Sequence, residues 1–149
     1  PEVTVTRAEF IRHLMIAMEK TDDIEINNIP FDDVTGNEWY ATYIKNALYY
    51  NIIGTEGIFN SEKFRPNDKI TNQEAAVYYM RALGYRDYLE ETSTIDKYIS
   101  KSSELGLPFE VLFFPESLLD RGNEAVFLHN LLDIEVLGTN KTFFEYYKE

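Results

Sequence analysis

Apolar residues recur every three or four positions in three stretches of the chain, and each stretch opens on a residue that can cap a helix. The first begins at Thr6 and carries Phe10, Ile11, Leu14, Met15 and Met18. The second begins at Thr71 and carries Ala76, Tyr79, Met80 and Leu83, and the third begins at Asp120 and carries Ala125, Leu128, Leu131 and Leu132. Because residues at this spacing share one helix face, the pattern predicts three amphipathic helices.

The starts of the first two helices follow a capping-box pattern. Glu9 comes three residues after Thr6, and Glu74 comes three residues after Thr71. At this spacing the Thr hydroxyl accepts a hydrogen bond from the third helical amide, and the Glu carboxylate accepts one from the Thr amide. Gly84 is placed to end the second helix in a left-handed conformation. We therefore interpret these Thr and Glu residues as structural.

A second kind of helix is predicted over residues 37–50. Two series spaced by four residues combine into one broad apolar face, made by Trp39, Tyr43, Ala47, Tyr40, Ile44 and Leu48. Asn51 follows at the position of a left-handed cap. Residues 95–105 and Gly106 repeat this arrangement 55 positions later (Tyr43 to Tyr98), and a third copy begins 104 positions later (Thr35 to Thr139).

A short segment ahead of the first kind of helix occurs three times, at residues 1–9, 66–74 and 115–123. Each copy has Pro, three variable residues, an aliphatic residue, and then Thr or Asp. The copies start 65 (66 − 1) and 49 (115 − 66) residues apart. Recurrence at this period indicates a chain built by repeating one supersecondary unit. Because the chain starts at such a boundary, we expect it to be a piece of a longer protein.

Composition narrows the functional classes. The chain has 149 residues, 44% of them apolar, and a net charge of −12 from 14 basic and 26 acidic residues. This balance disfavours nucleic acid and anionic lipid as partners, although a local cationic pocket can still hold an anionic ligand. The absence of Cys excludes disulfides and zinc–thiolate sites. No apolar run approaches the roughly 20 residues that span a bilayer, so we expect no membrane insertion.

The sequence offers little for catalysis or metal binding. His13 and His129 stand alone, without a second ligand at helical spacing, so we expect no metal site. Paired carboxylates such as Asp32 and Asp33 could suggest a hydrolase, but adjacent acids are common on the surface of a chain with 26 of them. We therefore expect neither enzymatic activity nor a cofactor.

The order of several residues resembles the S-layer homology (SLH) repeat. The residues that carry the resemblance are Phe31-Asp32-Asp33-Val34, Trp39-Tyr40, Ile53-Gly54, Phe64-Arg65-Pro66, Ile70-Thr71 and Glu74, together with Thr6-Arg7-Ala8-Glu9. The resemblance divides the chain into the final helix of a preceding repeat (1–20), a nearly complete repeat (31–85), a degenerate repeat (86–132) and the start of a further repeat or a tail (133–149).

The resemblance implies a fold and a function. Domains of this family are all-α, with helix-loop-helix repeats in a pseudo-threefold arrangement around a central helical bundle. They tether exported proteins to the cell wall of Gram-positive-type bacteria by binding secondary cell-wall polysaccharide, often pyruvylated, in grooves between repeats. The implied ligand-binding residues are Arg7, Asp33, Trp39, Gly54 and Arg121. The implied partners are this polysaccharide and neighbouring domains of the same extracellular protein.

The same residues can be interpreted without a ligand. Arg7 and Arg121 occupy first helical positions, which the helix dipole makes slightly unfavourable for a cation, so we weigh ligand contact evenly against a solvated surface role. Trp39 lies on an apolar stripe, which favours a core anchor over a sugar platform. Asp33 is expected to cap the approach to the helix over 37–50 or to bind sugar hydroxyls, and Gly54 is most simply a turn residue.

Departures from the family pattern support a competing hypothesis. Asn72 and Gln73 replace Arg and Ala in the middle copy, and Thr94 occupies the position that matches Trp39. One residue of the pair Tyr49-Tyr50, and one of Tyr78-Tyr79, is expected near the surface, because adjacent helical residues point about 100° apart. A degenerate scaffold that packs against other parts of a surface protein therefore competes with the polysaccharide-binding module.

Overall fold

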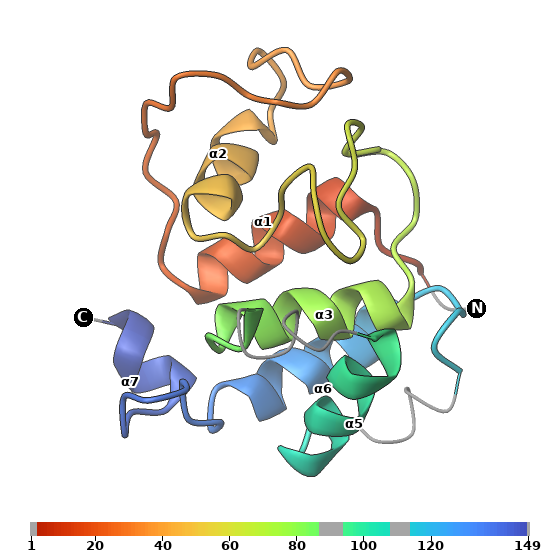
Figure 1. The fold of residues 1–149 in the computed structure, drawn as a ribbon, viewed down its shortest axis with the longest axis vertical. Coiled ribbons are helices and arrows are strands. Elements are labelled where there is room, and N and C mark those ends of the chain that lie inside the picture. The colour runs from red at the N-terminus through yellow and green to blue at the C-terminus, as the bar shows by residue number, and fades with distance from the viewer. Residues whose placement is uncertain (1–2, 87–93, 108–113, 149) are drawn as a thin grey trace.

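The computed structural model describes residues 3–86, 94–107 and 114–148, so parts of the degenerate repeat lie outside the described residues. Helices and connecting turns make up these ranges, with isolated bridges but no strand, which confirms the expected all-α class. The helices are α1 (Arg7–Ala17), α2 (Ala41–Tyr49), α3 (Asn72–Ala82), α5 (Ile95–Glu104), α6 (Arg121–Leu131) and α7 (Phe143–Lys148) (Figure 1).

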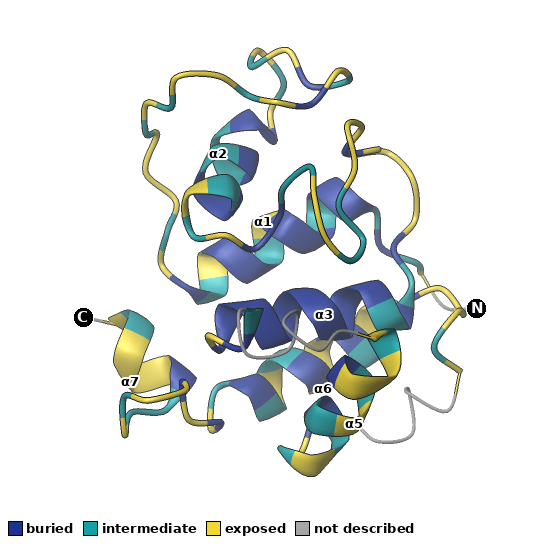
Figure 2. Ribbon diagram, viewed as in Figure 1, coloured by how far each residue is buried: buried dark blue, intermediate teal, exposed yellow. Residues whose placement is uncertain are grey.

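Helix α3 forms the centre of the core. Every residue of this helix except Gln73 is buried, and Figure 2 shows it almost wholly in the colour of buried residues. Aromatic rings connect it to both neighbours: the centroid of Tyr79 lies 5.1 Å from that of Phe10 in α1 and 5.1 Å from that of Phe127 in α6. Such tilted and edge-on pairs add to the free energy gained by burying the rings.

The segments directly ahead of α1, α3 and α6 form a closed ring of hydrogen bonds. The amide of Val5 donates to the carbonyl of Leu119 at 3.1 Å, that of Leu119 to Ile70 at 2.9 Å, and that of Ile70 to Val5 at 2.9 Å. All three side chains are fully buried. The aliphatic residue in each copy of the repeated segment thus joins the three segments where α1, α3 and α6 begin. The pseudo-threefold arrangement of whole repeats stays a prediction.

The predicted helix ends are confirmed. Thr6 and Thr71 make complete capping boxes with Glu9 and Glu74, and Asp120 accepts the amide of Asn123 at 2.8 Å. Asn51 and Gly84 end their helices with φ of 60° and 87°, in the left-handed region.

Two expectations about helices were wrong. Helix α2 begins at Ala41 rather than near residue 37, because the Glu38 carboxylate accepts the amides of Thr35 and Gly36 at 2.9 Å and holds a turn there. Tyr78 and Tyr79 are both buried, at 1% and 0% exposure, although one of them was expected near the surface. Because α3 is covered on several sides, adjacent side chains that point apart can both reach the core.

The remaining helices pack around this centre. Helix α2 packs on α1, and α5 packs on α3 (Figure 1). Helix α7 forms where the third copy of this kind of helix was predicted, and the Tyr147 hydroxyl donates to the carbonyl of Ala82, the last residue of α3, at 2.6 Å. Between α1 and α6 the surface has an open, largely apolar groove lined by His13, Ile16, Ala17, Ala125, Leu128, His129 and Leu132.

Candidate functional site

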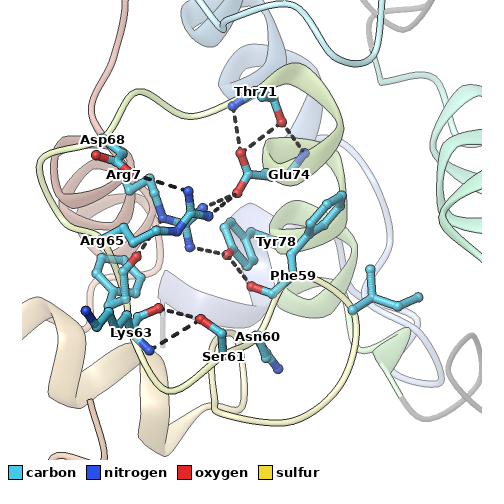
Figure 3. Close-up of polar contacts among 12 residues, drawn as sticks. Arg7, Phe59, Asn60, Ser61, Lys63, Arg65, Asp68, Thr71, Glu74 and Tyr78 are labelled. Carbon is cyan, nitrogen blue, oxygen red and sulfur yellow. Dashed lines mark hydrogen bonds and ion pairs between the residues drawn. The ribbon is translucent and has the colours of Figure 1, made fainter. Parts of the chain in front are cut away.

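Arg7, the first residue of α1, points into the junction between α1 and α3 and is only 2% exposed. Its guanidinium donates from Nε to the carbonyl of Phe64 and from Nη2 to the hydroxyl of Tyr78, both at 2.8 Å. Nη1 forms an ion pair with Glu74, and Figure 3 shows Glu74 and Tyr78 beside the Arg7 guanidinium. Of the two roles weighed for Arg7, the solvated surface role was therefore wrong, because the segment ending at Phe64 folds over it.

The Glu74 carboxylate both caps α3 and pairs with Arg7. One oxygen, Oε1, accepts the Thr71 amide at 3.1 Å and so completes the cap of α3. The other, Oε2, pairs with Arg7 and lies 3.6 Å from the Arg65 guanidinium. The Tyr78 hydroxyl continues the network by donating to the carbonyl of Phe59 at 3.3 Å. The cluster thus ties α1, α3 and the loop between α2 and α3 together (Figure 3).

The equivalent contact recurs between the third and first copies of the repeated helix. Nη2 of Arg121 donates to Oε2 of Glu9 at 3.0 Å, and 57% of the Arg121 side chain is exposed. Hydrogen bonds from Thr6, chiefly that of its backbone amide, and the nearby Arg121 charge lower the pKa of Glu9 against the opposing effect of burial. The signature Arg of one copy therefore pairs with the signature Glu of the next.

The junction between the second and third copies of the repeated helix lacks both the Arg and the Glu of this pair. Asn72 stands at the Arg position and Asn123 at the Glu position, three residues after the Asp120 cap. Asn72 keeps one feature of Arg7, since its side-chain amide donates to the carbonyl of Phe114 at 3.0 Å. Sequence reasoning treated each Glu as a cap alone, although the joint loss of Arg and Glu signalled their partnership.

Asp33 holds the end of the loop that covers Arg7. Its two carboxylate oxygens accept the amides of Phe64 and Arg65, each at 2.8 Å. Arg65 has φ of 59°, a left-handed conformation that costs a non-glycine residue energy. Of the two roles weighed for Asp33, capping the approach to the helix over 37–50 was wrong, because its carboxylate instead caps this loop. Asp33 thereby fixes the loop that places the Phe64 carbonyl on the Arg7 guanidinium.

Trp39 lies in the turn before α2 and is 59% exposed, so the prediction of a core anchor was wrong. The late start of α2 explains this, since its buried side begins with Tyr40 at the N-cap and continues to Ile44. The indole packs edge-on against Tyr40, with 5.3 Å between ring centroids. Burial, followed by the nearby carboxylates of Glu38 and Asp33, raises the pKa of Tyr40.

Gly54 and Arg65 both lie in the loop between α2 and α3. A Cβ on Gly54 would lie 3.5 Å from the Asn60 side chain and 4.0 Å from that of Arg86, and its φ lies outside the left-handed region. The backbone conformation at position 54 therefore does not require glycine. Arg65, which sequence reasoning did not single out, is about half exposed, with its guanidinium 3.3 Å from Asp68. The signal that could have identified Arg65 was its position between Phe64 and Pro66, within the residues that carry the family resemblance.

No group of three or more potential metal-ligating side chains occurs in residues 3–86, 94–107 and 114–148. None of the helices in those ranges combines the length and hydropathy needed to cross a bilayer.

The family comparison assigns the central part of the chain. Residues 30–76 match the S-layer homology domain. This match confirms the resemblance and includes Asp33, Trp39, Gly54 and Glu74. The chain therefore carries a domain of the S-layer homology family.

Three bacterial proteins are similar over most or much of the chain. The middle cell wall protein of Brevibacillus brevis is 28% identical over 136 residues, 90% of this chain and 12% of that protein. The surface layer protein of Brevibacillus choshinensis is 31% identical over 106 residues, 70% of this chain and 9% of that protein. The cell surface protein of Thermoanaerobacter kivui is 26% identical over 136 residues, 89% and 17% of the two lengths. The chain thus spans less than a fifth of each relative.

Proposed function

We propose that this chain is a non-catalytic anchoring module that binds acidic secondary cell-wall polysaccharide, in its pyruvylated form, beside Trp39. The observation that carries the proposal is the exposure of Trp39, the only Trp of the chain, in the turn that joins the Asp33 segment to α2. An exposed indole costs apolar burial, and a flat aromatic surface suits the face of a sugar ring.

The family match and the similar proteins support a role at the cell wall. The chain carries an S-layer homology domain, and the three similar proteins are described as wall or surface proteins. Together they indicate a protein of the cell surface that is associated with the cell wall. The polysaccharide itself, its pyruvyl group and the absence of catalysis belong to our proposal.

The five implied site residues divide into contact and positioning roles. Trp39 stacks on a sugar, and the exposed Arg121 offers a guanidinium to a carboxylate at the junction of α6 and α1. Arg7 and Asp33 are positioning residues, because their polar groups are engaged with the loop ending at Phe64. Gly54 lies near the start of that loop beside Asn60 and Arg86, and we assign it no contact of its own with the polysaccharide.

Arg65 joins the contact set in this proposal. Its side chain is half exposed, and Asp33 fixes its backbone through the bond to the Arg65 amide. A guanidinium presents paired donors to a planar carboxylate, which is the geometry that a ketal-linked pyruvate offers. Asp33, which accepts the Arg65 amide, precedes Trp39 by six residues, so it links this cation to the segment that carries the indole.

One set of contacts favours a second candidate, a degenerate scaffold within a surface protein. Arg7 and Arg121 each already have a carboxylate partner within the chain, in Glu74 and Glu9. These pairs give both signature arginines a structural role that needs no polysaccharide. On this hypothesis the partners are neighbouring domains of the same surface protein, and the exposed aromatic residues are their contact points.

Sedimentation with purified wall sacculi that carry pyruvylated polysaccharide tests the proposal. We expect the chain to be retained, and Trp39→Ala to weaken retention about tenfold, equivalent to ~1.4 kcal/mol. Phe114→Ala is the matched control, because Phe114 is an exposed aromatic residue (67%) in the segment ahead of α6. Arg65→Gln should weaken retention as well, with the exposed Arg12→Gln as its control.

Three outcomes would count against the anchoring module. Equal retention on sacculi stripped of the polysaccharide would show binding to another wall component. No retention on intact sacculi would favour the scaffold. Release of soluble sugar during incubation would contradict the non-catalytic assignment.

A further inference from the structure

A second aromatic surface lies at the opposite end of α2 from Trp39. Here a pocket of about 310 Å³ is lined by Lys20, Tyr50, Tyr146 and Tyr147. Three parts of the fold contribute, because Lys20 follows α1, Tyr50 follows α2, and the two other tyrosines belong to α7. At 1.5 Å per helical residue, the length of α2 separates this pocket from Trp39 by roughly 15 Å. The pocket is therefore distinct from the surface described above.

The tyrosines offer both ring surfaces and hydroxyl groups. Tyr147 is fixed, since its hydroxyl donates to the Ala82 carbonyl at 2.6 Å and burial raises its pKa. Tyr146 stands perpendicular to it, with 4.8 Å between ring centroids, and is 42% exposed. Within the described ranges the hydroxyls of Tyr50 and Tyr146 have no hydrogen-bond partner. Two hydroxyls are thus available to a ligand beside exposed ring surface.

Lys20 supplies a positive charge at the same place. Its ammonium lies 5.5 Å from the centroid of the Tyr50 ring, within the range of a cation–π contact. No described carboxylate forms an ion pair with it, although the chain as a whole carries a net charge of −12. An ammonium without a carboxylate partner, beside the Tyr50 ring in a pocket that two further tyrosines line, suits an anion that brings its own apolar surface.

We propose that this pocket binds a sugar residue that bears a carboxylate. The tyrosine rings contact the C–H face of the sugar, the hydroxyls of Tyr50 and Tyr146 hydrogen-bond to it, and the Lys20 ammonium pairs with the carboxylate. The volume lies at the lower end of the range for small-molecule sites. The inference rests on the proposed function, because it makes the pocket a second contact point for the acidic polysaccharide.

The neighbouring surface allows the saccharide to continue. Tyr50 also lines an adjacent pocket of about 360 Å³, whose other lining residues are Asn51, Arg81, Gly84 and Arg86. The Arg86 guanidinium donates to the carbonyl of Asn51 at 2.8 Å, which sets the side chain along this wall. A chain of at least two sugar residues could therefore pass across Tyr50, with cationic side chains in both pockets.

Titration of the 149-residue chain with two soluble sugars, followed by heteronuclear NMR, tests the proposal. The probes are methyl β-D-glucuronide and the uncharged methyl β-D-glucoside. We expect the glucuronide to shift resonances of Lys20, Tyr50 and Tyr146 with millimolar affinity, at least fivefold tighter than the glucoside. Lys20→Gln should remove this preference, and Tyr146→Ala should weaken both sugars.

Two matched variants control for general effects. Lys45→Gln removes a lysine of α2 whose ammonium lies 3.2 Å from Asp23, and Phe114→Ala removes an exposed ring in the segment ahead of α6, outside the pocket lining. Neither should change binding, and all variants should keep the wild-type spectrum outside the pocket. Equal binding of the two sugars, shifts elsewhere, or binding insensitive to both pocket variants would overturn the proposal.

Sacculus sedimentation separates this proposal from the function on which it rests. If the wild type is retained but the glucuronide does not shift the pocket, the pocket proposal fails and the anchoring module stands. If the glucuronide binds in the pocket while sacculi do not retain the chain, the site stands and the proposed function fails. Retention that both Trp39→Ala and Tyr146→Ala weaken would support two contact points.

Discussion

Arg7 and Glu74 form a buried ion pair that joins the first copy of the repeated helix to the second. Each partner also makes a second contact. Arg7 donates a hydrogen bond to the Phe64 carbonyl, and Glu74 accepts the Thr71 amide and so completes the cap of α3. Arg121 and Glu9 form the corresponding pair at the surface, at 3.0 Å. The same two residue types therefore meet at two junctions of the repeat, once buried and once exposed.

The difference in burial predicts a large difference in stability. Arg7→Ala should lower the free energy of unfolding by roughly 3–5 kcal/mol, because it leaves the Glu74 carboxylate buried without its cation. Arg121→Ala should cost no more than about 1 kcal/mol, because that pair is exposed. Urea denaturation of both variants measures the contrast. Similar losses would mean that the burial of Arg7 contributes little.

The Arg–Glu pair that is missing between the second and third copies of the repeated helix can be introduced by substitution. Asn72→Arg alone should destabilise the chain, because position 72 is only 4% exposed and would receive a cation without a carboxylate. Adding Asn123→Glu, the position that matches Glu9 and Glu74, should recover stability. We expect a coupling free energy of about 1–3 kcal/mol in a double-mutant cycle. A coupling near zero would show that the two positions do not meet as the other pairs do.

Local sequence predicted the helix ends better than it predicted which side chains are covered. The caps at Thr6, Thr71 and Asp120 depend on residues three positions apart, and all three form as expected. The burial of Arg7 depends on a loop that ends 57 residues later at Phe64, which no local pattern contains. The exposure of Trp39 depends on where α2 begins. Only the burial of Arg7 therefore required the folded arrangement of distant segments, because Glu38 holds the turn ahead of α2 through the nearby amides of Thr35 and Gly36.

The loop over Arg7 should open when Asp33 is changed. Asp33→Ala removes the acceptor for two amides, those of Phe64 and Arg65, and leaves Arg65 in its left-handed conformation without support. A loss of about 1–3 kcal/mol is expected from the unpaired groups. Hydrogen–deuterium exchange should be faster at those two amides than in the wild type. Unchanged exchange there would contradict the capping role.

Glu9 should make stability depend on pH. Hydrogen bonds from Thr6 and the Arg121 charge hold its pKa below the ordinary value of 4.5. A carboxyl group whose folded pKa is lowered stabilises the fold above its unfolded pKa, and this contribution is lost as pH falls through the folded pKa. Glu9→Gln should therefore be less stable than the wild type at pH 7, with a smaller difference near pH 3. Denaturation at both pH values measures this, and a constant difference would refute it.

Trp39 fluorescence should report both the fold and the proposed ligand. Because this single Trp is 59% exposed, its emission should lie at the long wavelengths of solvated indole, and acrylamide should quench it efficiently. Stacking on a sugar removes water from the ring, so pyruvylated wall polysaccharide should shift the emission to shorter wavelengths and reduce quenching. Arg65→Gln should keep the free spectrum and require more polysaccharide for the same shift, whereas Arg12→Gln should behave as the wild type. Emission typical of a buried indole in the free chain would contradict the structure, and an unchanged spectrum at saturating polysaccharide would place binding away from Trp39.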